Sequence, residues 1–188
     1  MPPKVKITKN DIINKGLELI RNKGEVAINA RYLASALGCS TQPIFSNFES
    51  MEDLYAQLIT EAYKLYLDFI QNELKDGKYP PYKAYGMAYI RFAKEEKELF
   101  KLLFMRDRTG EELSTSPDFE QSVEMIMKAN NFSREIAMLM HLEMWAFVHG
   151  IAVMMATSFL ELDEDLISRI ISDVYLGVRT KLLSEDKQ

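Results

Sequence analysis

The segment Ala30–Phe48 constrains the fold of this chain more than any other, because its spacing predicts two short helices joined by a tight turn. Ala34 is small enough to let the two helices cross closely, and Gly38 tolerates the positive φ that such a turn requires. The apolar residues expected to pack this motif against a preceding helix are Leu33, Leu37, Ile44 and Phe48. The segment therefore predicts a helix-turn-helix.

The second helix of this motif would leave mostly short, hydroxyl or amide side chains in solvent. Side chains of this kind suit the base edges and phosphates of a DNA major groove. Together with Ser40 in the turn, the residues expected to contact DNA are Thr41, Gln42, Pro43, Phe45, Ser46 and Asn47. The basic residues expected to bind phosphates, which fix the docking without reading sequence, are Lys4, Lys6, Lys9 and Arg31.

The distribution of charge supports the same interpretation. The chain of 188 residues has a formal charge of −5, yet residues 1–48 hold seven basic against three acidic side chains. This +4 leaves −9 for the remaining residues. A basic first quarter on an acidic body is typical of a nucleic-acid-binding module with a separate second part.

Helical periodicity dominates the rest of the chain, and no strand is predicted. Thr8 with Asp11, and Ser50 with Asp53, have the spacing of capping boxes at helix starts, and Asn29 is a candidate N-cap. Residues 76–81 and 107–117 are expected to be breaks, the second ending in Ser116-Pro117 before a new helix. The expectation is an all-α fold of about nine helices.

The last two predicted helices are unusually apolar. Residues 136–160 are apolar nearly all round, and a helix of this kind must be covered on every side. The longest apolar run, residues 144–156, is shorter than the roughly 20 residues of a membrane span, so we expect a buried helix and no membrane. The pattern favours a homodimer interface built by Ile151, Met155, Phe159, Leu166, Ile170, Val174 and Val178.

No set of residues predicts catalysis. The sequence has no Ser-His-Asp spacing, metal-ligand cluster or glycine-rich phosphate loop, so we expect no enzyme, no metal and no cofactor. His141 and His149, eight residues apart, are expected to be satisfied core histidines rather than metal ligands. The single cysteine, Cys39, fits buried packing better than redox sensing, and is compatible with a reducing cytoplasm. A helical adaptor or a small enzyme with the same fold stays the alternative.

Residues 8–58 resemble the tetracycline-repressor family of bacterial regulators. Arg31 and Ala34 match the second helix of the family signature, and Gly38 and Ser40 match its turn. The third helix and the entry to the fourth are matched by Ile44, Phe48, Ser50 and Leu54. The residues 145–150, Trp-Ala-Phe-Val-His-Gly, are also similar to a pattern in some C-terminal domains of the family. Three positions depart from it: Phe45 replaces a tyrosine, Asn47 a second aromatic residue and Met51 a lysine.

The resemblance implies a DNA-binding domain at 1–50 and a helical regulatory and dimerisation domain at 51–188. It also implies that a small-molecule effector binds inside the second domain and changes the spacing of the two DNA-binding domains. The shortage of charges among the candidate residues favours an apolar or aromatic effector. These candidates are Tyr63, Tyr85, Tyr89, Phe100, Phe104, Met125, His141, Met144 and Trp145.

Overall fold

The fold is all-α, as expected from the sequence. The computed structural model describes residues 7–107, 109 and 117–185. These residues form nine α-helices and one short 3-10 helix, and they contain no strand. Lys4, Lys6 and Ser116 of the sequence predictions lie outside the described residues.

The chain divides into two compact units. Unit 1 comprises Met1–Leu67 and Glu96–Arg106, and unit 2 comprises Asp68–Glu95 and Asp107–Gln188. The long helix α4 (Met51–Asp76) runs through both. The predicted boundary at residue 50, between a DNA-binding domain and a regulatory domain, does not follow from this division and stays a prediction.

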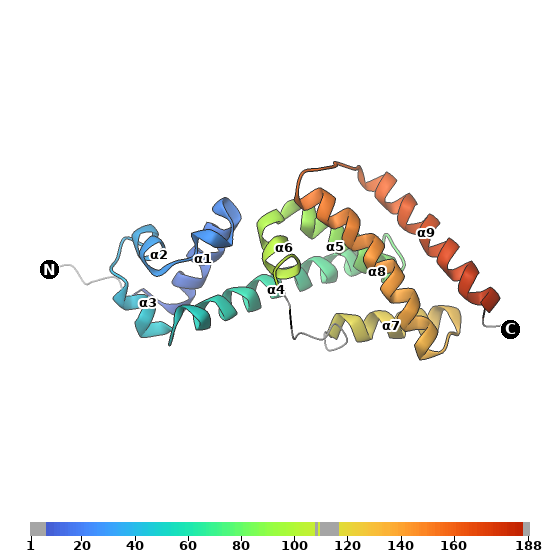
Figure 1. The fold of residues 1–188 in the computed structure, drawn as a ribbon, viewed down its shortest axis with the longest axis horizontal. Coiled ribbons are helices and arrows are strands. Elements are labelled where there is room, and N and C mark those ends of the chain that lie inside the picture. Colours follow the sequence, from blue (N-terminus) through green and yellow to red (C-terminus); the bar gives the residue numbers. More distant parts are fainter. Residues whose placement is uncertain (1–6, 108, 110–116, 186–188) are drawn as a thin grey trace. The chain divides into compact units, whose positions relative to one another are not determined.

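Unit 1 is a small helical domain (Figure 1). Its helices are α1 (Lys9–Lys23), the 3-10 helix η1 (Glu25–Ala27), α2 (Ala30–Ala36), α3 (Gln42–Asn47), the first part of α4, and α6 (Lys97–Phe104). The predicted capping box starts α1: the Thr8 amide donates to the Asp11 carboxylate (2.8 Å), and the Asp11 amide donates to the Thr8 hydroxyl (3.2 Å). The core side chains with no exposed surface include Ile12, Ile20, Leu33, Ile44 and Leu54.

Two polar contacts hold the helices of unit 1 together. The Arg21 guanidinium donates to both carboxylate oxygens of Glu96, at 2.8 and 2.9 Å, which ties α1 to the start of α6. The Tyr55 hydroxyl donates to Glu25, which ties α4 to η1. Burial, and then this bond, raise the pKa of Tyr55 to about 12, so the phenol is a donor at neutral pH.

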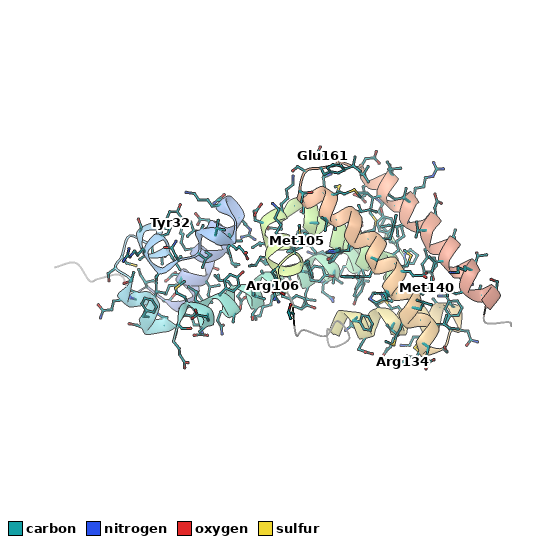
Figure 2. All side chains as sticks on the ribbon, viewed as in Figure 1. Tyr32, Met105, Arg106, Arg134, Met140 and Glu161 are labelled. Atoms are coloured by element: carbon teal, nitrogen blue, oxygen red, sulfur yellow. The ribbon has the colours of Figure 1, made fainter. Side chains whose placement is uncertain are left out.

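Unit 2 is built around α8 (Arg134–Ala156), which contacts α5 (Pro81–Glu95), α7 (Pro117–Asn130) and α9 (Glu164–Glu185) (Figure 1). Arg134, labelled in Figure 2, donates to Glu120 at 2.8 Å and so joins the start of α8 to α7. The α8 residues that fill the core of the unit are Ala137, Met140, Met144, Val148, Ile151, Ala152, Met155 and Ala156.

The other side of α8 is open. Leu139 and Leu142 are 45% and 50% exposed, and Ala146 and Gly150 continue the same face. By length and composition alone α8 could cross a membrane, with a mean hydropathy of 1.5, and 33% of that apolar window is buried. The complete cover expected for this helix is therefore not provided by the described residues of one chain.

Several helix boundaries differ from the sequence expectations. The predicted helix 136–160 begins at Arg134, because the Ser133 hydroxyl caps it (3.3 Å to the Ile136 amide), and it ends at Ala156. Ser158, with φ of 56°, lies beyond its end. The expected capping box at Ser50 is only half formed, because the Asp53 carboxylate accepts from the Glu49 amide instead.

Candidate functional site

The turn of the predicted helix-turn-helix is formed by backbone geometry that requires Gly38. Gly38 has φ of +66° and ends α2. Its amide donates to the Ser35 carbonyl (3.1 Å), and the Cys39 amide donates to the Ala34 carbonyl (3.0 Å). These two bonds form a Schellman motif, in which a glycine in the left-handed region satisfies the last carbonyls of a helix. The chain therefore leaves α2 in a fixed direction before α3 begins.

One side of the motif packs into unit 1. Leu33, Ala34, Ile44 and Phe48 are at most 3% exposed, and Leu37 is half-buried. Asn29 caps α2 as expected, accepting from the Tyr32 amide at 2.9 Å. The apolar side expected from the sequence is thus formed, and it fixes which residues of α3 face away from the core.

The predicted DNA-contacting residues lie in two environments. Ser40, Gln42, Phe45 and Ser46 are exposed, and Phe45 has 51% of its surface in solvent. The half-buried members are Thr41, Pro43 and Asn47. α3 thus presents an amide, a hydroxyl and an aromatic ring to solvent.

Two of these side chains are bonded to their own helix. The Ser46 hydroxyl donates to the Gln42 carbonyl (2.9 Å), and the Asn47 amide donates to the Pro43 carbonyl (2.7 Å). Gln42 forms no side-chain hydrogen bond with any described residue. Among the α3 candidates, Gln42 is therefore the amide that a base edge could engage without breaking an existing bond.

The basic side chains of unit 1 differ in how they are neutralised. Lys15 and Arg21 form ion pairs with Glu18 and Glu96. Arg31 is exposed and has no carboxylate partner among the described residues. Lys9 places its ammonium 5.0 Å from the centre of the Phe48 ring, next to the end of α3. Arg31 and Lys9 are thus available to phosphates.

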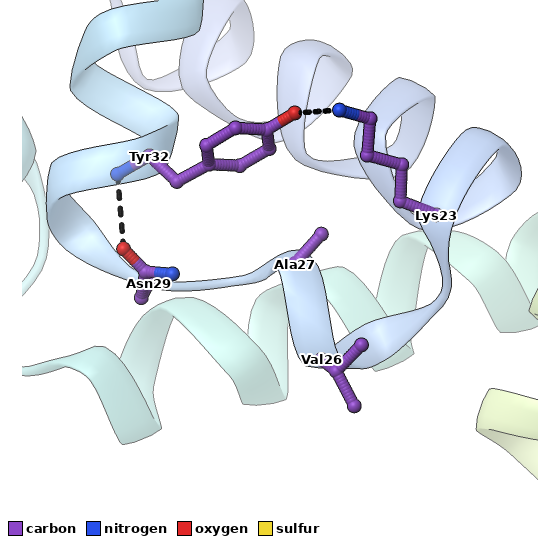
Figure 3. A pocket seen from close by; sticks show the side chains of 5 residues that line it. All are labelled: Lys23, Val26, Ala27, Asn29 and Tyr32. Carbon is purple, nitrogen blue, oxygen red and sulfur yellow. Dashed lines mark hydrogen bonds between the residues drawn. The ribbon is translucent and has the colours of Figure 1, made fainter.

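An open depression, lined by Lys23, Val26, Ala27, Asn29 and Tyr32, lies between the end of α1 and the start of α2 (Figure 3). Lys23 donates to the Tyr32 hydroxyl, and its ammonium lies 4.9 Å from the centre of that ring. Lys23 could not be selected from the sequence, because its proximity to Tyr32 depends on the path of η1, which was not predicted.

The residues predicted to line an effector pocket fall in both units. Tyr63, Phe100 and Phe104 belong to unit 1, where Phe104 packs against Phe100 with ring centres 5.2 Å apart. The other six belong to unit 2. Tyr85, Tyr89 and Met144 are buried there, and the half-buried members are Met125, His141 and Trp145.

Both histidines of unit 2 contact tyrosines of α5. His141 Nδ1 lies 3.0 Å from the Tyr82 hydroxyl, and His149 Nδ1 lies 2.8 Å from the Tyr89 hydroxyl. The Trp145 ring stacks on His149, with centres 5.1 Å apart. Burial lowers the pKa of His149. These contacts are those of satisfied core histidines, and no group of three potential metal-ligating side chains occurs in the described part of the chain.

The predicted interface residues are also divided by their exposure. Ile151 and Met155 are 3% and 2% exposed, because they pack inside unit 2, so they offer no surface to a second chain. Phe159 and Leu166 are 80% and 41% exposed. The half-buried members are Ile170, Val174 and Val178. The sequence missed Leu139 and Leu142, because an all-round apolar helix gives no signal for which side its own chain covers.

Comparison with known proteins supports a regulator fold. Residues 82–173 match the model of the tetracyclin repressor-like C-terminal domain family. The chain is similar to the crystal structure of a TetR-like transcriptional regulator from Rhodococcus sp. RHA1, with a TM-score of 0.67 and 12% identity over 98% of each chain. No curated protein sequence matches it. The structural likeness concerns the fold, and the family match covers parts of unit 2 together with residues 96–106 of unit 1. On this evidence residues 82–173 belong to the tetracyclin repressor-like C-terminal domain family, and the whole chain has the fold of a TetR-like regulator.

Proposed function

We propose that this protein is a cytoplasmic transcriptional repressor that binds operator DNA as a homodimer and is released by a small effector. The observation that carries the DNA-binding part is α3 itself. Its apolar side chain, Ile44, is buried, whereas Gln42, Phe45 and Ser46 are exposed. The turn that precedes the helix is fixed by Gly38. A helix held in this way has the form needed to enter a major groove.

The dimer is supported by the open face of α8. Leu139 and Leu142, with Leu166 and Leu176 of α9, leave large apolar side chains in solvent. A second copy that packs α8 and α9 against the same helices would cover these leucines and build a two-fold interface. Two DNA-binding domains in one dimer could then reach successive major grooves, about 34–36 Å apart.

The effector part rests on the family and on the aromatic character of unit 2. An effector that binds more tightly to a dimer with another spacing of its DNA-binding domains would lower DNA affinity by that difference in affinity. The buried candidates Tyr85, Tyr89 and Met144 favour an apolar or aromatic molecule. No reaction is required of the protein in this scheme.

The test is selection of bound fragments from a pool of random duplexes, followed by fluorescence anisotropy on the enriched sequence. We expect one enriched, two-fold symmetric sequence, bound with an affinity that falls steeply as salt rises. Sedimentation should give a mass near twice the 21.7 kDa of the chain. A monomer without salt-dependent DNA affinity would contradict the proposal.

A further inference from the structure

Lys83 of α5 is a cation without a carboxylate partner among the described residues. Its half-buried ammonium donates to the hydroxyls of Ser168 (2.7 Å) and Ser172 (2.8 Å) of α9. The nearby cations Lys78 and Arg91 each form an ion pair at 2.7 Å, with Glu164 and Glu73 respectively. No carboxylate of a described residue lies within 4.0 Å of the Lys83 nitrogen.

An aromatic ring and a second cation lie near this ammonium. The Tyr79 ring centre lies 4.9 Å from the Lys83 nitrogen and 5.1 Å from the Lys78 nitrogen. Burial, and then the charge of Lys78, lower the pKa of Lys83. A partly desolvated cation normally acquires a counter-charge, whereas the contacts of Lys83 with described residues are with two hydroxyls and a ring.

One of the two serines leaves its hydroxyl proton unused by any described residue. The Ser172 hydroxyl donates to the Ser168 carbonyl (3.0 Å), so its proton is already engaged. The Ser168 hydroxyl accepts from Lys83 and donates to no described residue. An ammonium has three protons, of which two are engaged. One N–H of Lys83 and the O–H of Ser168 therefore remain, close together, for an additional acceptor.

We propose that Lys83, Ser168 and Ser172 form a binding site for an oxyanion, either a carboxylate or a phosphate group of a small molecule. Charge-assisted bonds from an ammonium and a neighbouring hydroxyl are the chemistry that such groups require. An oxyanion bound there supplies the counter-charge that Lys83 lacks between α5 and α9. The site includes none of the residues predicted to line the effector pocket.

The site also lies apart from the predicted interface edge of α9. Ser168 and Ser172 are four residues apart and share one edge of the helix, whereas Ile170 is two residues from each and points about 200° away. The inference holds for a monomer or a dimer, and it does not depend on DNA binding.

Isothermal titration with inorganic phosphate, acetate and chloride, at pH 7.5 and constant ionic strength, tests the site. We expect saturable binding of phosphate, acetate or both, and none of chloride. The preference between the first two identifies the anion class. Lys83→Met should weaken binding about tenfold or more, because a hydrogen bond to a charged group is lost, and Lys83→Arg should retain part of it.

The matched control is Lys128→Met, which removes another unit 2 ammonium, exposed and paired with Glu124 at 3.3 Å. It should leave binding unchanged. Thermal melts without anion show whether each variant folds, and Ser168→Ala, a smaller change, should weaken binding if Lys83→Met does not fold. The absence of saturable binding to the wild type, or equal binding by the wild type and a folded Lys83→Met, would overturn the proposal.

Discussion

Helices α3 and α8 are built in opposite ways. α3 has six residues, buries Ile44, and exposes an amide, a hydroxyl and the Phe45 ring. α8 has 23 residues, buries eight of them, and exposes Leu139 and Leu142. Polar groups in water are already solvated, so α3 needs a partner that offers matching hydrogen bonds. Exposed leucines gain free energy from any apolar cover, so α8 needs a partner surface of its own kind.

Substitutions can therefore change the exposed surface of α3 and that of α8 independently. A substitution on the open face of α8 should change assembly first and DNA affinity only through assembly. A substitution on α3 should change DNA affinity and leave assembly unaltered.

The largest effect is expected from Leu142→Arg. If Leu142 is covered by a second chain, the substitution buries an unpaired charge, which costs roughly 3 kcal/mol or more and weakens dimerisation by about 100-fold. Sedimentation equilibrium over a dilution series measures this change. The control is Leu67→Arg, at an apolar residue of α4 that is 37% exposed, and it should leave the dimer intact. An unchanged dimer in Leu142→Arg would place the interface elsewhere.

The next effect concerns base recognition by α3. Gln42→Ala should weaken binding to the selected operator by about 1–3 kcal/mol, the value of a good amide contact to a base. Binding to unrelated duplexes should hardly change. Anisotropy titrations with both duplexes give the ratio of operator affinity to affinity for unrelated DNA.

Ser46→Ala is the matched control for Gln42→Ala, because the Ser46 hydroxyl already donates to its own helix. It should cost less on the operator. An equal loss on operator and unrelated DNA for Gln42→Ala would mean that Gln42 binds the backbone and reads no base.

A smaller effect should follow from Gly38→Ala. A Cβ at this position would meet no atom within 4 Å, so the cost is that of the left-handed backbone, about 1–2 kcal/mol. Part of it should appear as weaker operator binding, because the direction of α3 depends on this turn. Urea unfolding and anisotropy measure the two effects.

Gly77→Ala provides the matching control in unit 2. Gly77 has φ of +67°, and a Cβ added at this position would also meet no atom within 4 Å. The substitution should have a similar backbone cost without changing operator affinity in the folded dimer. If both variants lose operator affinity to the same extent, the loss reflects reduced stability and not a changed orientation of α3.

Much of unit 1 could be predicted because its signals are local. The cap at Thr8, the cap at Asn29 and the turn at Gly38 each depend on a few neighbouring residues, and the structure confirms all three. The side of α8 that its own chain covers could not be predicted, because Ile151 and Leu142 are equally apolar in sequence. Only the packing of α5, α7 and α9 distinguishes them.

The polar contacts of unit 2 could not be predicted for a related reason. Tyr89 and His149 are 60 residues apart, and Lys83 is 89 residues from Ser172. Such pairs depend on the register of helices that no short motif fixes. The sequence could identify the residue types, whereas the structure was needed to identify the partners.

The smallest effect concerns the half-buried His149 of α8. Burial lowers the pKa of His149 below the ordinary value of 6.5, so near and below pH 6.5 the unfolded chain binds a proton more readily than the folded one. The stability that this neutral histidine supports is present above pH 6.5 and is lost as the pH falls through the folded pKa. His149→Gln keeps a hydrogen-bond partner for Tyr89 and does not titrate. Urea unfolding at pH 7.5 and 5.5 should therefore show a larger loss for the wild type than for His149→Gln, while contributions of the carboxylates cancel in the comparison. Equal losses would mean that the His149 ring accepts a proton as easily in the folded protein as in water, although it contacts Tyr89 and Trp145.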